Sequence, residues 1–96
     1  MSSFSLELPA DFTEYQWEVE AKGWFSEARL TVSGKQHRLN FFDPARLGQE
    51  IQDELERGRV FFEPNLVVVR SVTKANMERA AALLVELDQV ASLVEA

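Results

Sequence analysis

Between Tyr15 and Phe42, apolar and polar residues alternate with a period of two, and the alternation changes phase at two glycine-centred breaks. A strand places successive side chains on opposite faces of a sheet, so this period predicts strands with one buried and one exposed face. We therefore expect a three-stranded antiparallel meander over residues 15–21, 24–33 and 36–42. Trp17 lies on the apolar side of the first segment and is expected to be buried.

The second break defines the expected register of the meander. In Gly34-Lys35 the glycine comes first, as a two-residue type II′ turn requires. Such a turn places Leu30 opposite Leu39 and keeps apolar side chains together on one face. It also places His37 opposite Val32, near the rim of that apolar face.

After the meander the period becomes helical. Asp43-Pro44 predicts a helix start, because an aspartate caps free backbone N–H groups and a proline at the first helical position has no N–H to leave unpaired. We expect this helix to run to about residue 57 and to stop at Gly58. Its apolar stripe of Leu47, Ile51 and Leu55 predicts that it lies on the sheet.

Two further apolar segments, 60–62 and 66–69, flank Glu63-Pro64-Asn65. The unbroken run of valines is typical of a strand that is buried on both sides or lies beside the first helix. Because Pro64 has no N–H for a ladder, residues 60–70 form either one bulged strand or a tight hairpin. A second helix is expected from Thr73, whose hydroxyl can cap it, to at least Leu87.

These elements predict one α+β domain over residues 1–96, with a two-layer architecture. Its sheet is mainly antiparallel, made of the three-stranded meander and one further strand, and both helices pack on one face. Residues 1–13 could add a short edge strand that stops at Pro9. A chain of 96 residues with a hydrophobic fraction of 46% is sufficient for a single core.

The formal net charge of −6 argues against several partners. A nucleic-acid backbone needs clustered cations, and between Met1 and Glu27 six acids accompany only Lys22, so nucleic acid is not an expected partner. No apolar run approaches the roughly 20 residues of a membrane span, so we expect no membrane partner. The absence of cysteine and of an N-terminal signal pattern favours a cytoplasmic location.

Residue types that carry chemistry are scattered along the chain. His37 is the only histidine, and Glu50, Asp53, Glu54 and Glu56 point in different directions round a predicted helix. The glycines are isolated, so no loop can cradle a phosphate. The sequence therefore predicts no catalytic residue, cofactor, metal or small-molecule ligand.

We interpret the chain as a small acidic soluble domain that acts as a non-catalytic protein-interaction or regulatory module and associates with itself or another protein. One alternative is an acidic inhibitor that covers a basic protein, because the acids are concentrated near the N-terminus. A second alternative is a small enzyme, which would need a pocket holding His37 and a carboxylate within hydrogen-bond reach.

A first candidate interaction surface lies on the polar face of the expected meander. Phe25 and Phe42 are out of phase with the apolar alternation, which leaves them on that face or at strand ends. There they would lie beside Arg29 and Arg38. Exposed aromatic rings next to cations are typical of an interaction patch.

A second candidate surface lies in the C-terminal segment. Leu83, Leu87, Val90 and Val94 have spacings of four, three and four, which is the repeat of a helix that faces a partner helix. Residues 89–96 are therefore either frayed or part of a homodimer interface. The other interpretation is that the helix bends or ends near Asp88, because a continuous helix would turn that carboxylate toward the sheet.

Overall fold

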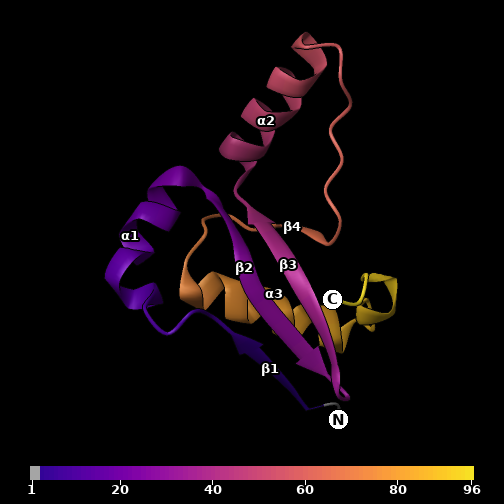
Figure 1. The fold of residues 1–96 in the computed structure, drawn as a ribbon. Coiled ribbons are helices and arrows are strands. Elements are labelled where there is room, and N and C mark those ends of the chain that lie inside the picture. Colours follow the sequence, from indigo (N-terminus) through magenta and orange to yellow (C-terminus); the bar gives the residue numbers. More distant parts are fainter. Residues whose placement is uncertain (1–2) are drawn as a thin grey trace.

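The computed structural model describes residues 3–96. Its strands lie in the order β1-β2-β3-β4; β1, β2 and β3 are antiparallel, and β4 runs parallel to β3 (Figure 1). The α+β class is confirmed, although the sheet is mixed. The elements are β1 (Phe4–Glu7), α1 (Phe12–Lys22), β2 (Trp24–Val32), β3 (Lys35–Phe42), α2 (Pro44–Glu56), β4 (Leu66–Val68), α3 (Lys74–Glu86) and a 3₁₀ turn at Val90–Ser92.

The segment predicted as the first strand of the meander is a helix, α1. Phe12, Tyr15 and Val19 recur at helical spacing and turn toward the core, and this period of 3.6 outweighs the period of two in the same residues. Trp17 is consequently 67% exposed, so the prediction that it is buried was wrong. The edge position beside β2 is occupied instead by β1, the short N-terminal strand.

The hairpin between β2 and β3 forms, but with a different turn. Ser33 and Gly34 both have positive φ values, 52° and 79°, so the two turn residues lie one position earlier than predicted. The favoured two-residue hairpin turn with positive φ at both positions is type I′, whose twist matches that of the strands. His37 therefore pairs with Leu30, and Leu39 pairs with Ala28. This shift of two residues leaves the side chains from Ala28 to Val32 and their partners on β3 on their predicted faces.

An irregularity in β2 changes which aromatic side chains face the core. The register with β3 shifts between Phe25 and Ala28, as in a β-bulge. The extra residue resets the alternation, so Phe25 lies on the same side as Ala28 and is buried, whereas Trp24 turns to the other side. The phase break in the sequence therefore marks a bulge and not an exposed phenylalanine.

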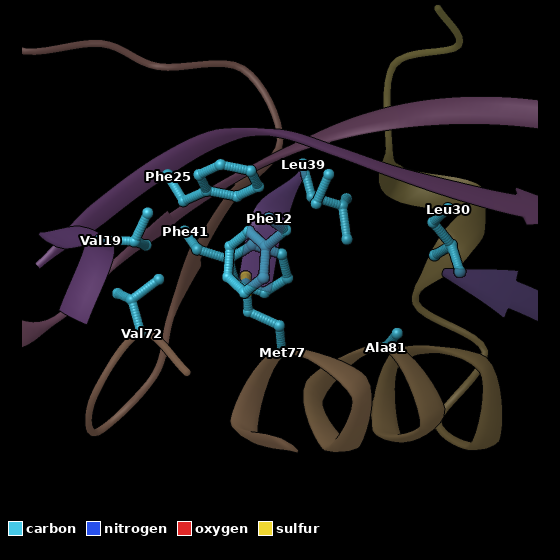
Figure 2. Packing of buried hydrophobic residues seen from close by; sticks show 10 residues of the cluster. Phe12, Val19, Phe25, Leu30, Leu39, Phe41, Val72, Met77 and Ala81 are labelled. Atoms are coloured by element: carbon cyan, nitrogen blue, oxygen red, sulfur yellow. The ribbon is translucent and has the colours of Figure 1, made fainter. Parts of the chain in front are cut away.

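One hydrophobic core joins α1, β2, β3 and α3 (Figure 2). Phe12 is close to Phe25, with their rings edge to face and 5.2 Å between centroids. Met77 of α3 points into the same cluster (Figure 2). The buried members are Phe12, Val19, Phe25, Ala28, Leu30, Leu39, Phe41, Val72, Met77 and Ala81.

Both predicted helix caps are confirmed. The Asp43 side chain accepts a hydrogen bond from the Arg46 N–H at 2.7 Å, and the Thr73 hydroxyl accepts one from the Asn76 N–H at 3.2 Å. The prediction that the first of these helices lies on the sheet was wrong, because no residue of α2 is buried. Figure 1 shows α2 rising away from the sheet beyond the end of β3.

The predicted strand pair at 60–69 yields one short strand. Only β4 pairs with β3, in parallel register with Asn40, Phe41 and Phe42, and it is an edge strand. The prediction of a strand buried on both sides was wrong, since the two outward side chains Leu66 and Val68 are exposed. Residues 57–65 run back from α2 to β4 as an extended connection (Figure 1).

Helix α3 ends at Glu86, and Asp88 takes a left-handed conformation with φ of 55°. The helix thus stops near Asp88, as one of the two interpretations predicted. A continuous coiled-coil stripe through Val90 and Val94 is therefore not formed within this chain. Val90 packs against the core together with Leu93.

Candidate interaction surface

His37 is not at a rim but is 4% exposed. Its Nδ1 lies 3.3 Å from the backbone carbonyl of Val94, in the C-terminal segment of the same chain. Among residues 3–96, no group of three or more His, Asp or Glu side chains is placed to hold a metal ion. His37 is therefore a buried side chain whose ring nitrogen contacts a backbone carbonyl.

Of the first candidate surface, the two arginines are exposed as expected but the two phenylalanines are not. Phe25 and Phe42 are both buried, which corrects the expectation of exposed rings. Phe42 lies on the outer face of the sheet, but Phe61 covers it with ring centroids 6.1 Å apart. Arg29 and Arg38 do lie directly opposite each other on β2 and β3, and both are exposed.

The second candidate surface divides between the tail and α3. Asn65 holds Val94 in place: its Nδ2 donates to the Val94 carbonyl at 2.9 Å, and its Oδ1 accepts from the Val94 N–H at 2.7 Å. The Ala96 N–H donates to the Gln36 carbonyl at 2.7 Å. The tail thus binds beside β3 of its own subunit, and Leu83 stands apart from it as an exposed residue of α3.

The most exposed part of the molecule is an arm, which we define as residues 44–65: helix α2 and the extended connection that returns to β4. Asn40 fastens its end, donating from Nδ2 to the Pro64 carbonyl at 2.7 Å. At its start, the Arg46 guanidinium carbon lies 6.0 Å from the centroid of the Trp24 ring. The arm is anchored at its two ends and projects away from the sheet (Figure 1).

The arm contains two ion pairs, one within α2 and one that joins α2 to the start of the connection. Arg46 pairs with Glu50 at 2.8 Å, and Arg59 pairs with Glu54 at 2.8 Å through Nε, with a second hydrogen bond from Nη2 at 2.9 Å. The hydrogen bond from Arg59 lowers the pKa of the Glu54 carboxyl. This two-point contact makes the arm a preorganised unit.

Large apolar side chains of the arm face solvent. Leu55 is 60% exposed, Val60 77% and Phe62 79%. Exposed β4 residues Leu66 and Val68 continue directly from the arm. Several large exposed apolar side chains on one segment of a chain are typical of an interaction site.

A groove lies next to the arm, between the end of β4 and α3. Its open volume is about 480 Å³. Val68 and Val69 line one side, Leu83 lies on the other, and Arg70 and Arg79 add two guanidinium groups. Neither arginine forms an ion pair with another residue in the part of the chain that the structure describes.

Sequence reasoning missed both the arm and the groove. The apolar stripe of Leu47, Ile51 and Leu55 predicts that α2 packs against an apolar surface. It does not indicate whether that surface belongs to the same chain or to another one. One signal was available: Val60 and Phe62 are separated from β4 by Pro64, so the connection could not join the ladder as a regular strand. The groove depends on two elements meeting in space and has no local signature.

In residues 3–96 none of the helices has both the length and the apolar character needed to cross a membrane. We also compared the chain with protein-family models, with curated proteins and with solved structures. None of the three comparisons gave a match, so the site is interpreted from its own geometry.

Proposed function

We propose that this protein is a non-catalytic interaction module that associates with a second copy of itself through the arm. The observation that carries the proposal is that α2, a helix of 13 residues, has no buried residue. Isolated helices shorter than about 12–15 residues are marginal in water, and most helices are stabilised by packing of their apolar face. The arm of a lone subunit leaves that packing incomplete.

A second copy is a suitable occupant on grounds of charge. The arm carries five carboxylates and three arginines, so it presents charges of both signs. Two arms can therefore bring carboxylates of one copy next to arginines of the other. The exposed side chains Leu55 and Phe62 then supply the apolar contact that drives association.

The test replaces both exposed apolar side chains of the arm. We expect the full chain to be dimeric in light scattering across a dilution series and the variant Leu55→Gln/Phe62→Gln to dissociate at least about tenfold more readily, as for the loss of a hot-spot contact. Trp17→Ser is the matched control, because it removes an equally exposed side chain outside the arm. A wild-type chain that stays monomeric at high micromolar concentration would refute the proposal.

A second candidate function rests on α1. This helix presents the exposed Trp17 beside the exposed carboxylates Glu14 and Glu18, with Lys22 as its only cation. A tryptophan face and neighbouring carboxylates suit an arginine-rich partner, through cation–π and ionic contacts. This arrangement supports the idea of an acidic cover for a basic protein.

This second function predicts a salt-sensitive fluorescence change when an arginine-rich peptide is added. The titration is made in a Trp24→Phe background, so that only Trp17 reports. We expect binding to weaken markedly between 50 mM and 500 mM salt, because exposed charges are screened. No change at low salt, or the same change in a Trp17→Ser control that keeps only the Trp24 indole, would remove this candidate.

A further inference from the structure

We infer that the groove between β4 and α3 is the receptor for the arm of the second subunit, so that the dimer forms by reciprocal exchange of arms. This inference rests on the proposed self-association and names its contact surface. Three other hollows in residues 3–96, at residues 6–13, beside Trp17 and beside Phe4, do not combine an apolar wall with two unpaired arginines as this groove does.

The unpaired charges of the two surfaces are opposite in sign. On the groove, Arg70 and Arg79 form no ion pair with a described residue. On the arm, Glu50 and Glu54 are paired internally, but Asp53 and Glu56 have no cationic partner in residues 3–96 and are exposed. Asp53 and Glu56 are three residues apart and so lie on one side of α2.

The apolar parts match in the same way. Val68, Val69 and Leu83 give the groove an apolar lining, of which Val68 and Leu83 are exposed. The arm offers Val60 and Phe62 of its connection, which are 77% and 79% exposed. Leu55 lies roughly 160° round α2 from Asp53, so it makes its contact outside the groove.

The position of the groove in the chain makes the exchange reciprocal. Val68 lies three residues beyond the end of the arm, so each subunit presents an arm and a groove side by side. The subunit's own α2 rises away from α3 (Figure 1), and no residue of α2 lines the groove. A two-fold axis between two such subunits brings each arm to the groove of the other, which gives a closed dimer.

The experiment uses two complementary charge reversals in the full chain. The groove variant is Arg70→Glu/Arg79→Glu, and the arm variant is Asp53→Lys/Glu56→Lys. All four positions are exposed, and lysines in the last turns of α2 suit the helix dipole, so both variants should fold, as circular dichroism will check. Each variant alone should dimerise at least about tenfold more weakly than wild type, because like charges then meet.

Mixing the two variants gives the decisive result. In a mixed dimer the acidic arm of one subunit meets the arginine groove of the other, and the lysine arm meets the glutamate groove. We expect a heterodimer to form at concentrations where each variant alone is monomeric. Native mass spectrometry distinguishes the three species by mass.

A control separates the groove from general charge repulsion. Arg29→Glu/Arg38→Glu changes the net charge by the same amount on the outer face of the sheet, and it should leave the dimer intact. The inference is overturned if this control dissociates the dimer equally, if the groove variant stays dimeric, or if the mixture does not pair. A groove variant that stays dimeric while Leu55→Gln/Phe62→Gln dissociates would leave the proposed function standing and remove only the groove.

Discussion

Replacing Phe41 with alanine is expected to lower the free energy of unfolding by roughly 3–5 kcal/mol, as for other fully buried phenylalanines. Phe41 is 0% exposed, pairs with Phe25 across β2 and β3, and lies in the cluster that Met77 joins from α3 (Figure 2). Small domains have about 5–15 kcal/mol of stability in total, so this loss leaves a marginal fold.

The measurement is a urea titration with all variants at one protein concentration, so that the concentration dependence of any dimerisation does not enter the comparison. Trp17→Ala is the control. Its side chain is the larger of the two but is 67% exposed, so its removal should change the stability by no more than about 0.5 kcal/mol. Equal losses for the two variants would show that the core does not centre on Phe41.

Gly23→Ala is expected to cost about 2–4 kcal/mol, from two sources that add. Gly23 ends α1 with a φ of 73°, a conformation that strains any residue with a Cβ. That Cβ would also lie 2.6 Å from Cγ of Asp43, the residue that caps α2. The added methyl therefore disturbs the base of the arm as well as the end of α1.

Two other glycines provide controls for these two sources. Gly34 has a φ of 79° but open space around its Cβ position, so Gly34→Ala should show the backbone strain alone. Gly48 lies in α2 with open space and no positive φ, and Gly48→Ala should stabilise the protein by about 0.5–1 kcal/mol. Unfolding titrations that rank Gly23→Ala no worse than Gly34→Ala would contradict the contact with Asp43.

Local chemistry made several elements predictable. The caps at Asp43 and Thr73 depend on a side chain and a backbone N–H only three residues away, so the sequence contains both partners. The stop of α3 near Asp88 follows from one carboxylate that burial would penalise. The alternation in β2 and β3 likewise predicted which of their side chains face the core, apart from the phase break at the bulge.

The candidate site was predicted less well. Of the seven residues proposed for it, Phe25 and Phe42 are buried, Val90 packs on the core, and Leu83 lines the groove. Phe25 was misplaced because a bulge of one residue inverts the face of everything on one side of it. Phe42 was misplaced because Phe61, 19 positions further along the chain, returns to cover it.

The sequence by itself determined where α2 begins and ends, where α3 begins, and the alternation of β2 and β3, since these depend on contacts within a few residues. Only the tertiary structure decided whether segment 15–21 is a strand or a helix, because Tyr15–Ala21 satisfies both periods and the choice depends on which side chains the core accepts. It also decided that α2 leaves the sheet: Leu47, Ile51 and Leu55 require an apolar partner, but their spacing does not say which chain supplies it.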